Sequence, residues 1–167
     1  MFESLKIVRG MSACERLLAM IAIDTDNLEP AQLHAERAEE LYTQMRDSWG
    51  VVEARLLRAQ VALAQRNHGE ARRALMQARE IQLREPEPRQ HYLLTRAWFQ
   101  LDNGESESAQ EALNAAATVF ERPWQVGEHT PHLLARLARL SWPDPQTLTG
   151  LTQWRQVILD QARRERL

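Results

Sequence analysis

The feature of this sequence that most constrains its fold is a three-alanine spacing that occurs three times. In each copy the second alanine follows the first by twelve residues, and the third follows the second by seven. The copies are Ala19, Ala31 and Ala38, then Ala59, Ala71 and Ala78, then Ala97, Ala109 and Ala116. Seven residues are two turns of an α-helix, so the second and third alanines share one helix face. Twelve residues carry the chain through a short turn onto the next helix. The pattern therefore predicts three antiparallel helix pairs.

The residues around the alanines support this interpretation. Polar turn residues separate the first two alanines of each copy, at 24–27, 66–69 and 102–104. Ala35, Leu75 or Leu113 follows the middle alanine by four positions and extends its apolar stripe.

This pattern resembles the tetratricopeptide repeat over roughly residues 12–120. That family places small residues at three positions with this spacing and a bulky residue between the last two. The strongest match is LAQRNHGEARRALMQA, and DNLEPAQLHAERAEEL is the next. The copies start 40 and 38 residues apart, longer than the family's period of about 34. A long period is similar to the repeat arrays of large bacterial signalling and transcriptional regulators. Arg58 and Arg96 also stand where the family commonly has leucine.

The resemblance implies an all-α fold, a right-handed superhelix of about three repeats plus a C-terminal capping helix pair. We expect one domain over residues 1–167, with repeats at about 12–50, 51–88 and 89–122 and a degenerate cap at 130–167. The expected helices are 12–23, 29–49, 51–65, 69–84, 89–101, 106–121, 131–140 and 146–166. A short helix over residues 1–10 is expected to end at Gly10.

Local signals predict how the first helices begin and end. Ser12 with Glu15 three residues later matches a capping box, which predicts a helix start at Ser12. Cys14 then falls in the first turn, and we expect it to be buried. Gly50 is expected to lie just beyond the end of the second helix.

Composition narrows the function classes. The formal net charge is −2, so no overall field attracts nucleic acid or an anionic membrane. Arg72, Arg73 and Arg79 alternate with acidic residues, which is typical of a solvated helix face. Cys14 is the single cysteine, which excludes an internal disulfide and fits a reducing compartment. The apolar stretch 17–23 is too short to cross a bilayer, and we expect a cytoplasmic protein with no membrane partner.

The sequence predicts no catalytic residue, no cofactor and no metal site. It contains no phosphate-binding glycine loop, dinucleotide fingerprint or nucleophile elbow. Glu36, Glu39 and Glu40 are interpreted as an exposed helix face. A weaker alternative is a small metal-dependent helical enzyme with a site at Glu128, His129 and His132. In that alternative, His129 and His132 would share a helix face, although a zinc site needs three or four ligands.

In tetratricopeptide proteins the first helix of each pair lines a concave groove that binds a partner. The resemblance assigns this peptide groove to Arg16, Met20, Ile23, Leu56, Gln60, Leu63, Leu94, Trp98 and Leu101. These residues are mostly apolar, so we expect a protein partner that supplies an amphipathic helix or an apolar segment, with Trp98 as the anchor.

Alternatives remain open for this groove. Leu56, Leu63 and Leu94 are equally well interpreted as core between repeats. The groove can also be covered by the chain's own C-terminal helix or by a second copy in a homodimer. In a further alternative, the chain is a self-associating domain of a larger regulator.

Overall fold

The computed structural model describes residues 2–80, 85–120, 127, 129–140, 154 and 156. These residues contain seven α-helices and no strand, which confirms the predicted all-α class. The chain divides into two compact units, Met1–Leu83 and Arg84–Leu167. Each unit is described by itself below.

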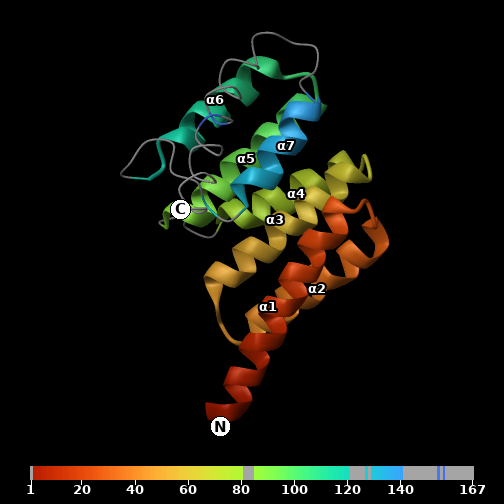
Figure 1. Cartoon of the computed structure of the whole chain (residues 1–167), viewed down its shortest axis with the longest axis vertical. Helices are drawn as coiled ribbons and strands as arrows, with labels where there is room; N and C mark the ends of the chain where they lie inside the picture. Colours follow the sequence, from red (N-terminus) through yellow and green to blue (C-terminus); the bar gives the residue numbers. More distant parts are fainter. Residues whose placement is uncertain are drawn as a thin grey trace. The chain divides into compact units, whose positions relative to one another are not determined.

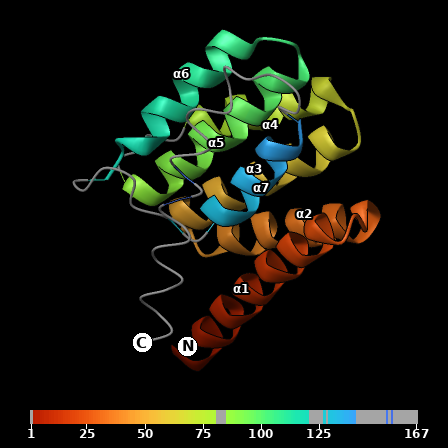
Figure 2. The ribbon, with the colours of Figure 1, turned by 45° about the horizontal axis from the view of Figure 1, so that its top comes forward.

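The first unit consists of four helices that pack mostly on their neighbours in sequence (Figure 1). They are α1 (Phe2–Asp24), α2 (Leu28–Gln44), α3 (Ser48–Ala64) and α4 (His68–Glu80). Helix α2 packs on both α1 and α3, α3 also packs on α4, and α1 touches α3. Figure 2 shows α1 and α2 running side by side from their short connecting turn.

The second unit is organised around α5 (Pro86–Asp102). This helix packs against both α6 (Ser106–Ala117) and α7 (Thr130–Leu140). Pro86 lies in the first turn of α5. A backbone N–H at that position has no carbonyl partner within the helix, so the N–H that proline lacks costs no hydrogen bond. The helix therefore starts three residues before the predicted Arg89.

Four of the described turns end their preceding helix in the same way. A residue with positive φ follows each helix: Asp26 (61°), Arg46 (56°), Arg66 (60°) and Gly104 (77°). The next residue donates its N–H to the carbonyl five positions back, at 2.8–2.9 Å in all four turns. This Schellman pattern satisfies carbonyls that the helix end leaves open. It also reverses the chain within about three residues.

All nine alanines of the repeated spacing are fully buried. Ala19, Ala31 and Ala35 form one apolar cluster with Leu57 and Val61, so small side chains lie where three helices converge. Methyl-sized side chains allow helix backbones to approach closely, which explains why alanine occupies these positions. The predicted helix pairs are present in this sense.

Helix α1 differs from its prediction because it runs without a break through Gly10. The capping-box interpretation of Ser12 is wrong. Its hydroxyl donates to the carbonyl oxygen of Arg9 at 2.9 Å, as a mid-helix serine does. Glu15 is instead paired with α2. Cys14 is correspondingly in mid-helix and exposed, which corrects its predicted burial.

The junction between α2 and α3 lies earlier than predicted. Helix α2 ends at Gln44 and α3 begins at Ser48, with Asp47 as the N-cap whose carboxylate accepts the N–H of Gly50 at 3.0 Å. Gly50 is therefore inside the first turn of α3, where a Cβ would collide with the ring of Tyr42. The glycine allows the ring to pack on the backbone.

The remaining boundaries agree within a few residues where they are described. Helix α6 ends at Ala117, four residues before the predicted end, and α7 begins at Thr130, one residue before the predicted 131–140. The predicted final helix, 146–166, lies outside the described residues apart from Trp154 and Gln156, which are helical. Among the described helices, none is long and apolar enough to cross a membrane.

Candidate functional site

The nine predicted groove residues are mostly covered. Met20 and Leu101 are half-buried, whereas the other seven are buried. Ile23 packs in the cluster of α1, α2 and α3, with Met20 against its edge. Trp98 is 3% exposed, and the guanidinium carbon of Arg136 on α7 lies 5.1 Å from the centroid of its ring. A ring covered by a cation in this way has little surface for a partner. Partner binding along these nine residues remains a prediction.

The histidines proposed for the weaker, enzymatic alternative occupy different environments. His129 precedes α7 and is buried, while His132 is exposed on that helix, so the two do not share a face. Glu128 lies outside the described residues. The ring of His129 stacks on that of His91, which α5 supplies, with centroids 3.9 Å apart and an interplanar angle of 14°. No motif in the sequence marks His91 as a candidate site residue.

A buried glutamine beside these rings holds the segment that leads into α7. The side-chain oxygen of Gln90 accepts the hydroxyl of Thr130 at 2.6 Å and the N–H of Gly127 at 2.9 Å. Its amide nitrogen donates to the carbonyl of Ala116 at 3.1 Å. Gln90 thus links α5 to α6 and to the start of α7. A satisfied buried network of this kind is best explained as structural.

A second polar cluster joins α2, α3 and α4. The carboxylate of Glu39 accepts from Arg55 at 2.8 Å and from Arg58 at 2.6 Å, and Arg58 also reaches Glu70 at 2.8 Å. Burial raises the pKa of Glu39, but the two guanidinium groups outweigh it and hold that pKa below its ordinary value. Glu39 is therefore not part of an exposed face, which corrects the prediction.

A surface hollow of about 490 Å³ lies beside this cluster, lined by Glu36, Glu39, Glu40, Thr43, Gln44 and Arg58. Glu39 and Arg58 are already paired with each other there. The arrangement ties three helices together, and this gives Arg58 a structural role. On α4, the exposed Arg73 pairs with Glu70 at 3.0 Å within the helix.

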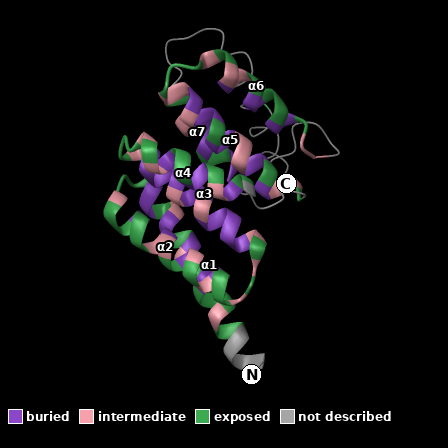
Figure 3. Cartoon of the chain, turned by 180° about the vertical axis from the view of Figure 1, so that it is seen from behind, coloured by how far each residue is buried: buried purple, intermediate pink, exposed green. Residues whose placement is uncertain are grey.

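The clearest uncovered surface among the described residues lies on α1. We define the α1 outer stripe as Ile7, Met11, Cys14, Leu17, Leu18 and Ile21. The five large members are between 43% and 63% exposed, and Cys14 is exposed as well. Figure 3 shows exposed residues along this helix. Five of the six follow spacings of four and three residues, the seam along which two helices pack.

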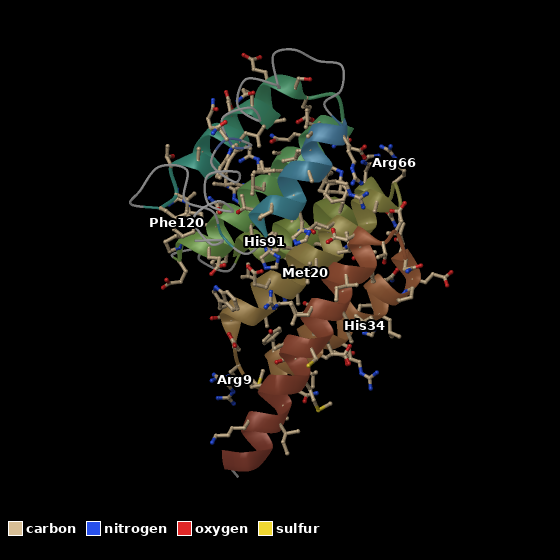
Figure 4. The ribbon with its side chains drawn as sticks, in the orientation of Figure 1. Arg9, Met20, His34, Arg66, His91 and Phe120 are labelled. Carbon is tan, nitrogen blue, oxygen red and sulfur yellow. The ribbon has the colours of Figure 1, made fainter. Side chains whose placement is uncertain are left out.

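The stripe is bordered by an ionic contact to α2. Glu15 accepts from His34, which is labelled in Figure 4, at 2.6 Å and lies 3.7 Å from Arg37. This contact fixes α1 against α2, so the stripe is held on a supported helix. Leu33 and Met76 are also exposed, but as isolated residues on other helices they need no functional explanation.

Sequence reasoning missed this stripe because it started the helix at Ser12, which separated Ile7 and Met11 from the rest. The spacing 7, 11, 14, 18, 21 was the available signal. Comparison with protein-family models, with curated proteins and with solved structures finds no match to this chain.

Proposed function

We propose that this chain is a protein-interaction module of tetratricopeptide-type helix pairs, whose α1 outer stripe binds a helix of another protein. The stripe carries this proposal. Exposed apolar side chains in a continuous line are the usual mark of a binding surface, and their four–three spacing suits a helical partner.

The packing beneath α1 supports the same function. Ala19 and Ala22 on its inner face are buried against α2 and α3, and Glu15 is tied to His34. A binding face on a preorganised helix loses little conformational freedom when a partner docks. The likeness to repeat arrays of bacterial regulators adds that such a module would act in signalling or regulation.

We place the partner surface on α1 and not on the nine predicted groove residues, because seven of those are buried.

The proposal is tested by selecting amphipathic helices from a display library against the purified chain. Affinities of the selected helices are then measured for the chain carrying Leu18→Glu or Ile21→Glu. Placing a charge in a desolvated contact is expected to weaken binding by about 30-fold or more, the effect of losing a binding hot spot.

The matched control is Leu33→Glu, which adds the same charge at an exposed apolar residue of α2 outside the stripe. Its effect on affinity is expected to be below about two-fold, because isolated surface changes are nearly neutral. Selected helices that bind equally well to the Leu18→Glu and Ile21→Glu chains would contradict the proposal, as would a library that yields no binder.

A further inference from the structure

Helices α1 and α3 occupy equivalent places in the first unit, 40 residues apart. Ala19 and Ala59 are both fully buried. The turns that follow have nearly the same φ, 61° at Asp26 and 60° at Arg66. Both turns are closed by an asparagine N–H that donates over 2.8 Å, Asn27 to Ala22 and Asn67 to Ala62. Positions on the two helices can therefore be compared one by one at this offset.

The face of α3 that corresponds to the α1 outer stripe is covered by α2. Val51 and Ala54 pack with Ala38 and Tyr42, and Leu57 and Val61 pack with Ala31 and Ala35. The equivalents on α1 of these four α3 residues are Met11, Cys14, Leu17 and Ile21, all of them exposed. The same helix face thus occurs twice in the first unit. On α3 it is covered by α2, and on α1 it is exposed to solvent.

Two glycines extend the correspondence. Gly50 of α3 lies beneath the ring of Tyr42, and its lack of a Cβ is what admits the ring. Its equivalent on α1 is Gly10, which is exposed and has no atom within 4 Å of the place a Cβ would take. Glycine in a helix interior costs about 0.5–1 kcal/mol relative to alanine. An aromatic ring of a partner that packs on Gly10 would explain why glycine occupies this position.

The charges on the two faces differ in one respect. On α3, Arg55 and Arg58 bind Glu39 of α2. The equivalent positions on α1 are Glu15 and Leu18. An acidic residue at the place of Glu39 would therefore meet a carboxylate and a leucine on α1, whereas a basic residue would share a carboxylate that His34 and Arg37 of α2 already contact.

From these correspondences we infer that the α1 outer stripe binds a partner helix that resembles α2 in its contact face. This helix presents small residues at i, i+4 and i+7, an aromatic at i+11 over Gly10, and a basic residue at i+8 near Glu15. In α2 these places are held by Ala31, Ala35, Ala38, Tyr42 and, at i+8, Glu39. The inference rests on the proposed function and specifies its partner.

The probe is a synthetic peptide of residues 27–45 with Glu39→Arg, held helical by a staple between positions 33 and 37. Both of those residues are exposed on α2, so the staple leaves the contact face intact. Binding of the labelled peptide to the full chain is followed by fluorescence anisotropy. We expect Gly10→Leu or Leu18→Glu in the chain, or Tyr42→Ala in the peptide, to weaken binding by at least about ten-fold.

Charge reversal separates docking on α1 from displacement of the chain's own α2. A peptide that invades at α3 should prefer the native Glu39, which Arg55 and Arg58 bind. A peptide on α1 should prefer arginine, and Glu15→Gln in the chain should remove that preference. Met76→Glu on α4 is the matched control and should leave binding unchanged. Preference for the native Glu39, or binding indifferent to Gly10→Leu and Leu18→Glu, overturns the inference.

The outcome also distinguishes this inference from the proposed function. If the stapled peptide fails to bind while library helices of another pattern bind and require Leu18, the inference is wrong and the function stands. If the chain sediments as a dimer that Leu18→Glu dissociates, the occupant is a second copy and the inference is again wrong. If no helix of any pattern binds, both fail.

Discussion

Helices α1 and α3 have apolar side chains at equivalent positions, but only those of α3 are covered. Leu57 of α3 packs against residues of α1 and α2, whereas its equivalent on α1, Leu17, is exposed to solvent. The two helices have similar sequence patterns, so the pattern alone does not state whether a face is core or surface. What differs is the neighbour, because α2 covers α3 and no described helix covers that face of α1.

The largest expected contrast comes from Leu57→Ala and Leu17→Ala. Removing a fully buried leucine leaves a cavity, so Leu57→Ala should lower the free energy of unfolding by about 3 kcal/mol. Leu17→Ala should change it by less than about 0.5 kcal/mol. Urea unfolding of both variants measures the difference. Equal effects would mean that Leu17 is covered, and would break the comparison between the helices.

Alanine at the two glycines should act with opposite sign. A Cβ at Gly50 forces the ring of Tyr42 aside, and such overpacking costs about 1–3 kcal/mol. A Cβ at Gly10 meets nothing, so Gly10→Ala should stabilise the chain by about 0.5–1 kcal/mol through helix propensity. Thermal unfolding of both variants checks the signs. Destabilisation by Gly10→Ala would show that the site over Gly10 is already filled.

The third contrast concerns charge. Glu39→Gln should cost about 1–2 kcal/mol because it weakens two charge-assisted hydrogen bonds, to Arg55 and Arg58. Glu15→Gln on α1 should cost less, since its close partner is a histidine that is charged only when protonated. Unfolding titrations at neutral pH compare the two.

The cost of Glu39→Gln should depend on pH in a defined direction. The folded pKa of Glu39 lies below its ordinary value of 4.5. Its ionised form therefore stabilises the fold fully above that value, and this contribution is lost as the pH falls through the folded pKa. The stability difference between the chain and its Gln variant should shrink on acidification. A difference that grows below pH 4.5 would contradict the assignment.

The smallest expected effect lies in the turns. Arg66 holds a φ of 60°, which is strained for an arginine, so Arg66→Gly should stabilise by about 0.5–1 kcal/mol. Asp26, with a φ of 61°, tolerates this conformation better, and Asp26→Gly should gain less. Unfolding midpoints of the two variants provide the test. A larger gain at Asp26 would indicate that the two turns are not equivalent.

The helix pairs could be predicted because their determinants are local. Alanine spacing, polar turns and Pro86 act within a few residues of the chain. These local signals are enough to predict which face of each helix is buried. Errors arose where local rules competed. Ser12 and Glu15 match the capping-box pattern, but Ser12 lies in the interior of α1, with helical turns on both sides.

The surface was harder to predict because exposure depends on partners distant in sequence. Trp98 looked like an open anchor, yet Arg136 lies over its ring. Glu39 looked solvated, yet Arg55 and Arg58 enclose its carboxylate. Neither of these contacts can be predicted from the spacing of residues along the chain. The apolar spacing of the α1 outer stripe is visible in the sequence. Only the structure shows that these residues are exposed and not part of the core.

The principal helix contacts of the first unit join neighbours or next-but-one neighbours in the chain. Such a topology has low contact order, and domains of this kind typically fold in about microseconds to milliseconds. Ribosomes add about 5–20 residues per second. Helix α2 can therefore dock on α1 well before α3 has left the ribosome. During that interval Tyr42 and Glu39 have no partner, and α2 presents to its surroundings the alanine face that α3 will later cover.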